Sequence, residues 1–239
     1  MSDAPTIDES SDSVDTDTLT RRRALSAGGA AAIAGLAGCT ALDLVTGDPA
    51  TFTAGTATVA DAALSESGYE LNDVTERTDT REFEAAGSTR EVRVTSRIAE
   101  YDKAVELLGE RYQAAVFAVL TTPRVEVLGQ AFNPVGELDD NERAQLIVDR
   151  YENVSNLERG SEYSTDILGT DAAVVVYSAD GEIEGTGVSV ELEFHVAETI
   201  EAGNDYVVPL AAYPAVFGDG ENVRRMLNGI EHEPASADD

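Results

Sequence analysis

Lysine is almost absent from this chain of 239 residues, because Lys103 is the only one and the other basic side chains are arginines. The 46 aspartates and glutamates far outnumber the 16 basic residues, which gives a formal charge of −30. A chain with this charge is repelled by phosphate backbones and by anionic lipid headgroups. The composition therefore argues against nucleic acid as a partner and against electrostatic binding to a membrane surface.

Cysteine and histidine are nearly as scarce, with one cysteine and two histidines in the whole chain. A single cysteine excludes an internal disulfide, and His195 and His232 are too few to build a Cys/His zinc site. Calcium needs only oxygen ligands, but the chain has no D-x-D-x-D-G loop. It also has no phosphate-binding P-loop and no G-x-G-x-x-G motif. The sequence thus predicts neither a metal nor a cofactor.

Acidic charge is spread along a chain that is still 42% hydrophobic, so the carboxylates indicate the solvated faces of an ordered domain. Repulsion among them is strong in dilute buffer and is screened in molar salt, where the Debye length falls to roughly 3 Å. Near-absence of lysine, together with dispersed carboxylates, resembles the composition of halophilic archaeal proteins. We expect a salt-adapted domain.

The N-terminal 38 residues are typical of an export signal that follows a disordered acidic leader. Residues 1–19 are polar and acidic, and the twin arginines Arg21 and Arg22 then precede an uncharged stretch over residues 24–37. As a helix this stretch would span about 21 Å, which is short of a bilayer core of about 30 Å. The pattern predicts a twin-arginine signal peptide over residues 1–38, not a membrane span.

The only cysteine of the chain, Cys39, follows Leu36-Ala37-Gly38, and these four residues match a lipobox. Small residues before the cysteine give a signal peptidase access, and the thiol is then modified by lipid. The alternative, a free cysteine buried as a small apolar side chain, lacks a neighbouring element to bury it. We expect residues 39–50 to form a lipidated tether on the outer face of the cytoplasmic membrane. Removing residues 1–38 leaves a charge of −27.

Residues 51–233 are predicted to form one domain, followed by a disordered tail over residues 234–239. In residues 188–196 apolar and polar side chains alternate, which is typical of a strand with one wet face. The segment 90–98 repeats the pattern, and turn signals at 86–88, 168–169, 180–181 and 203–205 indicate hairpins. Further strands are expected at 69–84, 113–121, 156–165, 170–179 and 205–213.

Helices are predicted at three places. One begins after Leu138 with Asp139 or Asp140 as its N-cap, a second covers residues 220–230, and a weaker one covers residues 60–67 and ends at Gly68. Strands and helices in this order predict an α+β fold, an antiparallel sheet meander with helices packed on one face. The order of elements resembles the PsbP/Mog1-like architecture.

Several segments of the chain also resemble a family of haloarchaeal, twin-arginine-exported lipoproteins of unknown function. Besides the leader, the resemblance is carried by Gly68-Tyr69-Glu70, by residues 116–123 and 125–127, by Phe132-Asn133-Pro134, by Tyr206-Val207-Val208 and by the closing residues 229–232. It covers most of the exported chain. Because no matched segment has an assigned chemistry, the resemblance implies a location and a single fold but no activity.

Neither histidine suggests catalysis. His195 stands on the polar side of its predicted strand beside Glu191 and Glu193, so we expect it to face water, and we expect His232 to lie at a polar helix end. Loops that carry apolar or proline residues are better candidates for binding: Phe132, Asn133 and Pro134 in one loop, Tyr213 and Pro214 in another. In each case the alternative is a turn whose aromatic ring packs into the core.

The sequence therefore favours a non-catalytic, lipid-anchored, extracytoplasmic domain that binds a protein partner or a small ligand through its loops. An alternative from another class is a hydrolase, or another enzyme, that works through paired carboxylates. The sequence singles out no catalytic residue for that alternative.

Overall fold

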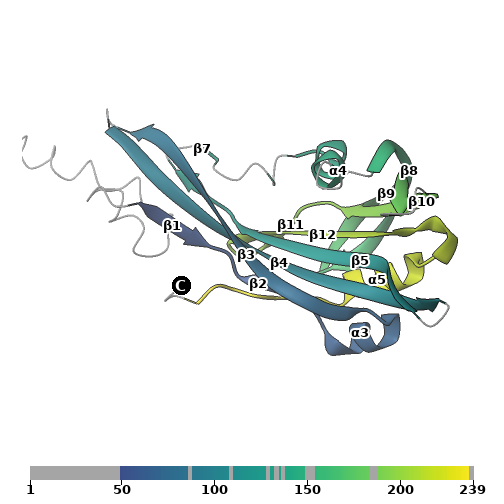
Figure 1. Cartoon of the computed structure of the whole chain (residues 1–239). Helices are drawn as coiled ribbons and strands as arrows, with labels where there is room; N and C mark the ends of the chain where they lie inside the picture. The colour runs from purple at the N-terminus through teal and green to yellow at the C-terminus, as the bar shows by residue number, and fades with distance from the viewer. Residues whose placement is uncertain are drawn as a thin grey trace, which may run out of the picture.

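The computed structural model describes residues 49–85, 88–107, 110–127, 130–131, 135, 138–148, 154–183 and 188–236. These residues form a long, mixed β-sheet of nine strands, two further sheets of two strands each, and a few short helices (Figure 1). The protein is thus rich in β-structure, and helix contributes less than the predicted α+β class implies. The likeness to the PsbP/Mog1-like architecture stays a prediction.

The strands and helices follow one another in this order: β1 (Ala50–Thr53), β2 (Thr56–Val59), α3 (Asp61–Ser67), β3 (Glu70–Ala85), β4 (Ser88–Leu107), β5 (Glu110–Pro123), β6 (Glu126–Val127), β7 (Gln130–Ala131), α4 (Asp140–Val148), β8 (Val154–Ile167), β9 (Thr170–Ile183), β10 (Val188–Ala197), β11 (Ile200–Ala202), β12 (Asp205–Pro214), η2 (Ala215–Phe217), α5 (Gly220–Asn228) and β13 (Ile230–Glu233). Every strand expected from the sequence is present. Several are longer than expected, above all β4.

The sheet is not a simple meander. Hairpins join β3 to β4 to β5 and, separately, β8 to β9 to β10, but β12 lies between β5 and β10 and pairs with both. Strand β1 also pairs with β4 in parallel. The prediction of consecutive antiparallel hairpins is therefore right for each group of three strands and wrong for the way in which the groups join, because a non-local pairing leaves no signal in local sequence.

The predicted turns have different outcomes. Leu168 and Gly169 both have positive φ, as a tight hairpin turn between β8 and β9 requires, and Gly203 has positive φ between β11 and β12. The turn predicted at 86–88 lies mostly outside the described residues. Gly181, predicted to lie in a turn, lies inside β9 and pairs with both β8 and β10. A Cβ on Gly181 would come within 2.6 Å of the Leu192 side chain, so here the glycine serves close packing.

Helix α4 begins as its sequence predicts. The backbone N–H of Glu142 donates to Oδ1 of Asp139 at 2.8 Å, and the Asp139 N–H donates back to the Glu142 carboxylate at 2.9 Å. This reciprocal pair is a capping box, so Asp139 is the N-cap. Helix α3 likewise ends at Gly68, which has a φ of 78°.

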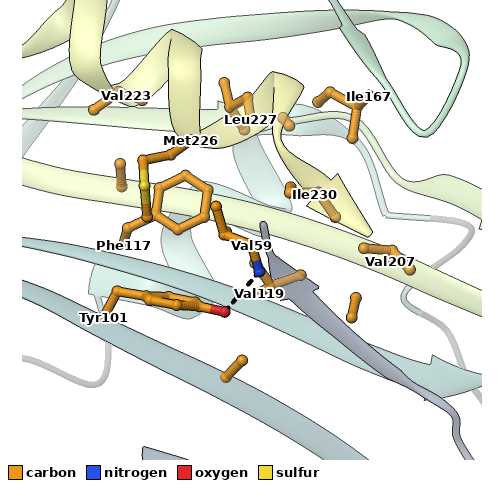
Figure 2. Close-up of a cluster of buried hydrophobic side chains, with 14 of the residues drawn as sticks. Val59, Tyr101, Phe117, Val119, Ile167, Val207, Val223, Met226, Leu227 and Ile230 are labelled. Atoms are coloured by element: carbon orange, nitrogen blue, oxygen red, sulfur yellow. Dashed lines mark hydrogen bonds between the residues drawn. The ribbon is translucent and has the colours of Figure 1, made fainter. Parts of the chain in front are cut away.

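Helices cover both faces of the sheet, not one. On the first face Val223, Met226 and Leu227 of α5 pack on a cluster that includes Phe117 and Tyr101 (Figure 2). On the other face Ala144 of α4 packs on a separate cluster made by strands β9 and β10: Val175, Tyr177, Ala179, Phe194 and Val196. The central strands are therefore buried on both sides.

Candidate functional site

A group of buried polar side chains lies where β8, β10 and β12 meet the start of α5. At its centre is His195 of β10, whose exposed fraction is only 5%. The expectation that His195 faces water is wrong, and the cause is the second covered face. Alternation along β10 separates apolar from polar residues correctly, but α5 covers the side that was expected to be wet.

Each ring nitrogen of His195 is hydrogen-bonded to a tyrosine hydroxyl. Tyr163 lies 2.9 Å from Nδ1, and Tyr213 lies 2.9 Å from Nε2. The Tyr213 hydroxyl donates its own proton to Glu193, so it accepts from His195. His195 is therefore the tautomer protonated at Nε2, and Nδ1 accepts from Tyr163. A directed chain of three hydrogen bonds runs from Tyr163 to Glu193.

A second set of polar side chains surrounds Asp219, the residue before α5. Its Oδ1 accepts from Nζ of Lys103 at 2.6 Å and from Nδ2 of Asn222 at 2.7 Å. Lys103 also lies over the ring of Tyr69, 5.6 Å from its centroid. The only lysine of the chain thus compensates a buried carboxylate at the point where α5 begins.

Burial and negative charge keep these tyrosines protonated. Burial raises the pKa of Tyr163 to about 12. The pKa of Tyr213 is raised well above its ordinary value by burial first and then by its hydrogen bond to Glu193. Burial, followed by the Asp219 carboxylate, does the same to the pKa of Tyr69. The tyrosines are therefore hydrogen-bond donors and not bases, and burial lowers the pKa of His195 to about 4, so it is neutral at pH 7.

This network ties several elements of the fold together. Both ring nitrogens of His195 in β10 are engaged by tyrosine hydroxyls, one from β8 and one from β12. Gly220 lies directly against the network, because a Cβ there would be 3.2 Å from the Tyr213 hydroxyl. The network thus fixes the end of β12 and the start of α5 to the sheet.

Between these two fixed points the chain forms an exposed apolar tip, which we define as Val216 and Phe217 of η2. Val216 is 86% exposed and Phe217 is 49% exposed. The tip ends at Gly218, which has a φ of 58° and so allows the sharp turn back into the protein. Tyr213 on one side and Asp219 on the other are both buried, so the tip is a short protrusion with rigid ends.

The predicted binding residues lie close to this tip or outside the described residues. Tyr213 is the residue before the last of β12, and its ring packs into the core, which is the alternative considered for it. Pro214, the last residue of β12, is half-buried opposite Leu192. Their role in binding stays a prediction. The remaining predicted residues lie outside the described part of the chain: Arg21, Arg22, Cys39, Phe132, Asn133 and Pro134.

His232, expected at a polar helix end, lies instead in strand β13, which pairs with β2. Its Nε2 is 2.8 Å from Oδ2 of the buried Asp205, and that oxygen also accepts from the backbone N–H of Gly55 at 3.0 Å. Asp205 therefore links Gly55, which lies between β1 and β2, to His232 of the last strand, β13. Short strands such as β13 carry too few residues for alternation to reveal them.

Sequence reasoning did not single out Tyr69, Lys103 or Asp219. Only Lys103 carried a signal, because it is the only lysine in a chain that otherwise uses arginine, and the structure pairs it with the buried Asp219. Among the described residues, no helix is long and apolar enough to cross a bilayer.

Comparison with known proteins gives one match. A family model described as a domain of unknown function, DUF6517, matches residues 56–231, the span from β2 to β13. No curated protein and no solved structure matches the chain.

Proposed function

The chain belongs to the DUF6517 family of domains of unknown function, and on that premise we propose that it is a lipid-anchored binding domain on the outer face of the cytoplasmic membrane. Arg21 and Arg22 would direct export, and lipid on Cys39 would hold the domain. The observation that carries the binding role is the exposed apolar tip, Val216 and Phe217.

The placement of the tip supports this proposal. In Figure 1 strand β1, which follows the tether, lies at the left end of the molecule, whereas the turn from β12 into α5 lies at the right end. A domain tethered before β1 would hold its tip away from the anchoring membrane. We therefore favour a protein partner over insertion of the tip into the same bilayer.

The partner would insert the two apolar side chains into a pocket of its own. Isolated exposed apolar residues are common on proteins. These two differ because hydrogen bonds of the buried residues Tyr213 and Asp219, one on each side, hold them in place, so binding costs little conformational entropy. A protein partner with a complementary apolar pocket and a basic rim would fit a domain with this acidic charge.

Replacing both tip residues by serine is expected to abolish co-purification of the partner from intact membranes. The fold should be unaffected, because substitutions at such exposed positions change stability by about 0.5 kcal/mol or less. Leu71→Ser is the matched control, since Leu71 is 49% exposed like Phe217 but lies on β3. If the Val216→Ser/Phe217→Ser protein retains the same partners as the wild type, the tip is not the binding site.

The acidic surface would adapt the domain to concentrated salt, as in halophilic archaea. Its carboxylates repel one another at low ionic strength, and screening removes that cost. We expect the melting temperature to rise as KCl increases from about 0.1 M to molar concentrations. A melting temperature that stays constant or falls over this range would refute salt adaptation.

A further inference from the structure

Strand β3 lies at one edge of the sheet, and β8 lies at the other. Residues 92–95 of β4 pair with β1 along one edge and with β3 along the other, and among the described residues β3 pairs with β4 alone. Every residue from Glu70 to Glu82 is exposed. From Leu71 to Glu82, β3 therefore has one edge that faces solvent and no neighbouring strand among the described residues.

The two outer edges of the sheet differ in regularity. At the other edge, the pairing of β8 with β9 is interrupted twice, between residues 155 and 158 and between residues 159 and 162, and Asn156 has a positive φ. Such irregularities prevent an edge strand from pairing with another chain. In β3 the pairing runs without interruption from Asp73 to Ala85, and no proline occurs. Of these two edges, only β3 is regular enough to accept a strand.

We propose that two copies of this chain pair through β3, antiparallel, with a two-fold axis at Thr78. In this register Arg77 of each copy lies opposite Asp79 of the other. Within one copy Arg77 already lies 3.3 Å from Asp79, so pairing would create an alternating ring of four charges. The proposal concerns a surface remote from the tip and does not depend on the binding role.

Charge on β3 selects this register against its neighbours. Moving the axis to any charged position in residues 76–79 would place that side chain opposite its own copy, and like charges directly opposite are destabilising. An axis at Thr80 would place Glu76 of one copy opposite Glu84 of the other, with the same penalty. An axis at Thr75 places no like charges opposite each other, but the paired segment would then be centred near the register shift between Leu71 and Asp73.

The backbone ladder and the charges have different roles in this pairing. Exposed ion pairs contribute little affinity, so the main-chain hydrogen bonds between the two copies of β3 would provide the binding. The charges would specify the register, because they penalise the competing alignments.

Single-cysteine cross-linking tests the register directly. In the full chain carrying Cys39→Ser, Thr78→Cys would place two thiols opposite each other, within reach of a disulfide. Thr80→Cys is the matched control, because its two copies would lie four residues apart along the strands, about 13 Å, which is too far. We expect mild oxidation to cross-link Thr78→Cys at least about tenfold faster. Equal rates, or no dimer from Thr78→Cys, would overturn the proposal.

Sedimentation at the lowest KCl concentration at which the wild type stays folded gives an independent test, because molar salt would screen the contacts between charges. Arg77→Glu is expected to weaken the dimer, because the introduced carboxylate of each copy would face Asp79 of the other, and the exchange Arg77→Asp/Asp79→Arg is expected to restore it. Arg225→Glu makes the same charge change on α5, far from this edge, and should leave the dimer intact. A wild-type protein that stays monomeric, or an Arg77→Glu protein as dimeric as the wild type, would contradict the inference.

Discussion

Lowering the pH from 6.5 to 4 is expected to reduce the free energy of unfolding by roughly 3 kcal/mol through His195 alone. The pKa of this histidine is about 4 in the folded protein, because burial disfavours the charged imidazolium. In the unfolded chain its pKa returns to about 6.5. Between these two values the unfolded chain binds a proton that the folded protein does not, so stability is lost as the pH falls.

Denaturant unfolding of wild type and of His195→Gln over this pH range measures the contribution. Glutamine keeps one donor and one acceptor for Tyr213 and Tyr163 but does not titrate, so the variant should lose less stability than the wild type. Carboxylates titrate in both proteins, and the difference between the two curves isolates the histidine. Identical pH dependence in wild type and variant would contradict the assignment.

Proton NMR offers a second measurement on the folded protein, since the chain has only two histidines. The His195 signal is expected to titrate near pH 4. A midpoint near 6.5 for the His195 signal would show that this imidazole is accessible to solvent. That result would also contradict the buried hydrogen-bond network of His195, on which the proposed rigidity of the tip depends.

Most of the strands could be predicted from the sequence because alternation is a local property. In β10 alternation correctly identifies Phe194 and Val196 as core positions, and the capping box at Asp139 and Glu142 marks the start of α4. The identity of the covered faces could not be predicted. It depends on α5, which lies later in the chain than β10, and on β12, which lies between β5 and β10 in the sheet.

The candidate site shows the same limit. The neighbouring Pro214 makes Tyr213 conspicuous in the sequence, but its contacts with His195 and Glu193, 18 and 20 residues earlier, depend on the pairing of β10 with β12. Asp219 and Lys103 are 116 residues apart. No spacing rule relates such positions. The predicted binding residues Tyr213 and Pro214 lie just before the exposed tip, because Pro214 is the last residue of β12 and the tip follows it in η2.

Substituting Cys39 is expected to have the largest effect of any single change, because it would relocate the whole protein. In the proposed function, attachment to the membrane depends on lipid carried by Cys39. Each buried CH₂ of an acyl chain contributes about 0.8 kcal/mol, and two chains hold a protein where one does not. Without the thiol no such chain can be attached.

The most direct test of the proposed function compares the membrane pellet and the soluble fraction of cells that express either the wild type or Cys39→Ser. Thr40→Ser, at the next position, controls for the effect of substitution in the tether. We predict that the wild type and Thr40→Ser sediment with the membrane and that Cys39→Ser is soluble. If Cys39→Ser sediments as completely as the wild type, the protein is not anchored by lipid at this cysteine and the proposed function is wrong.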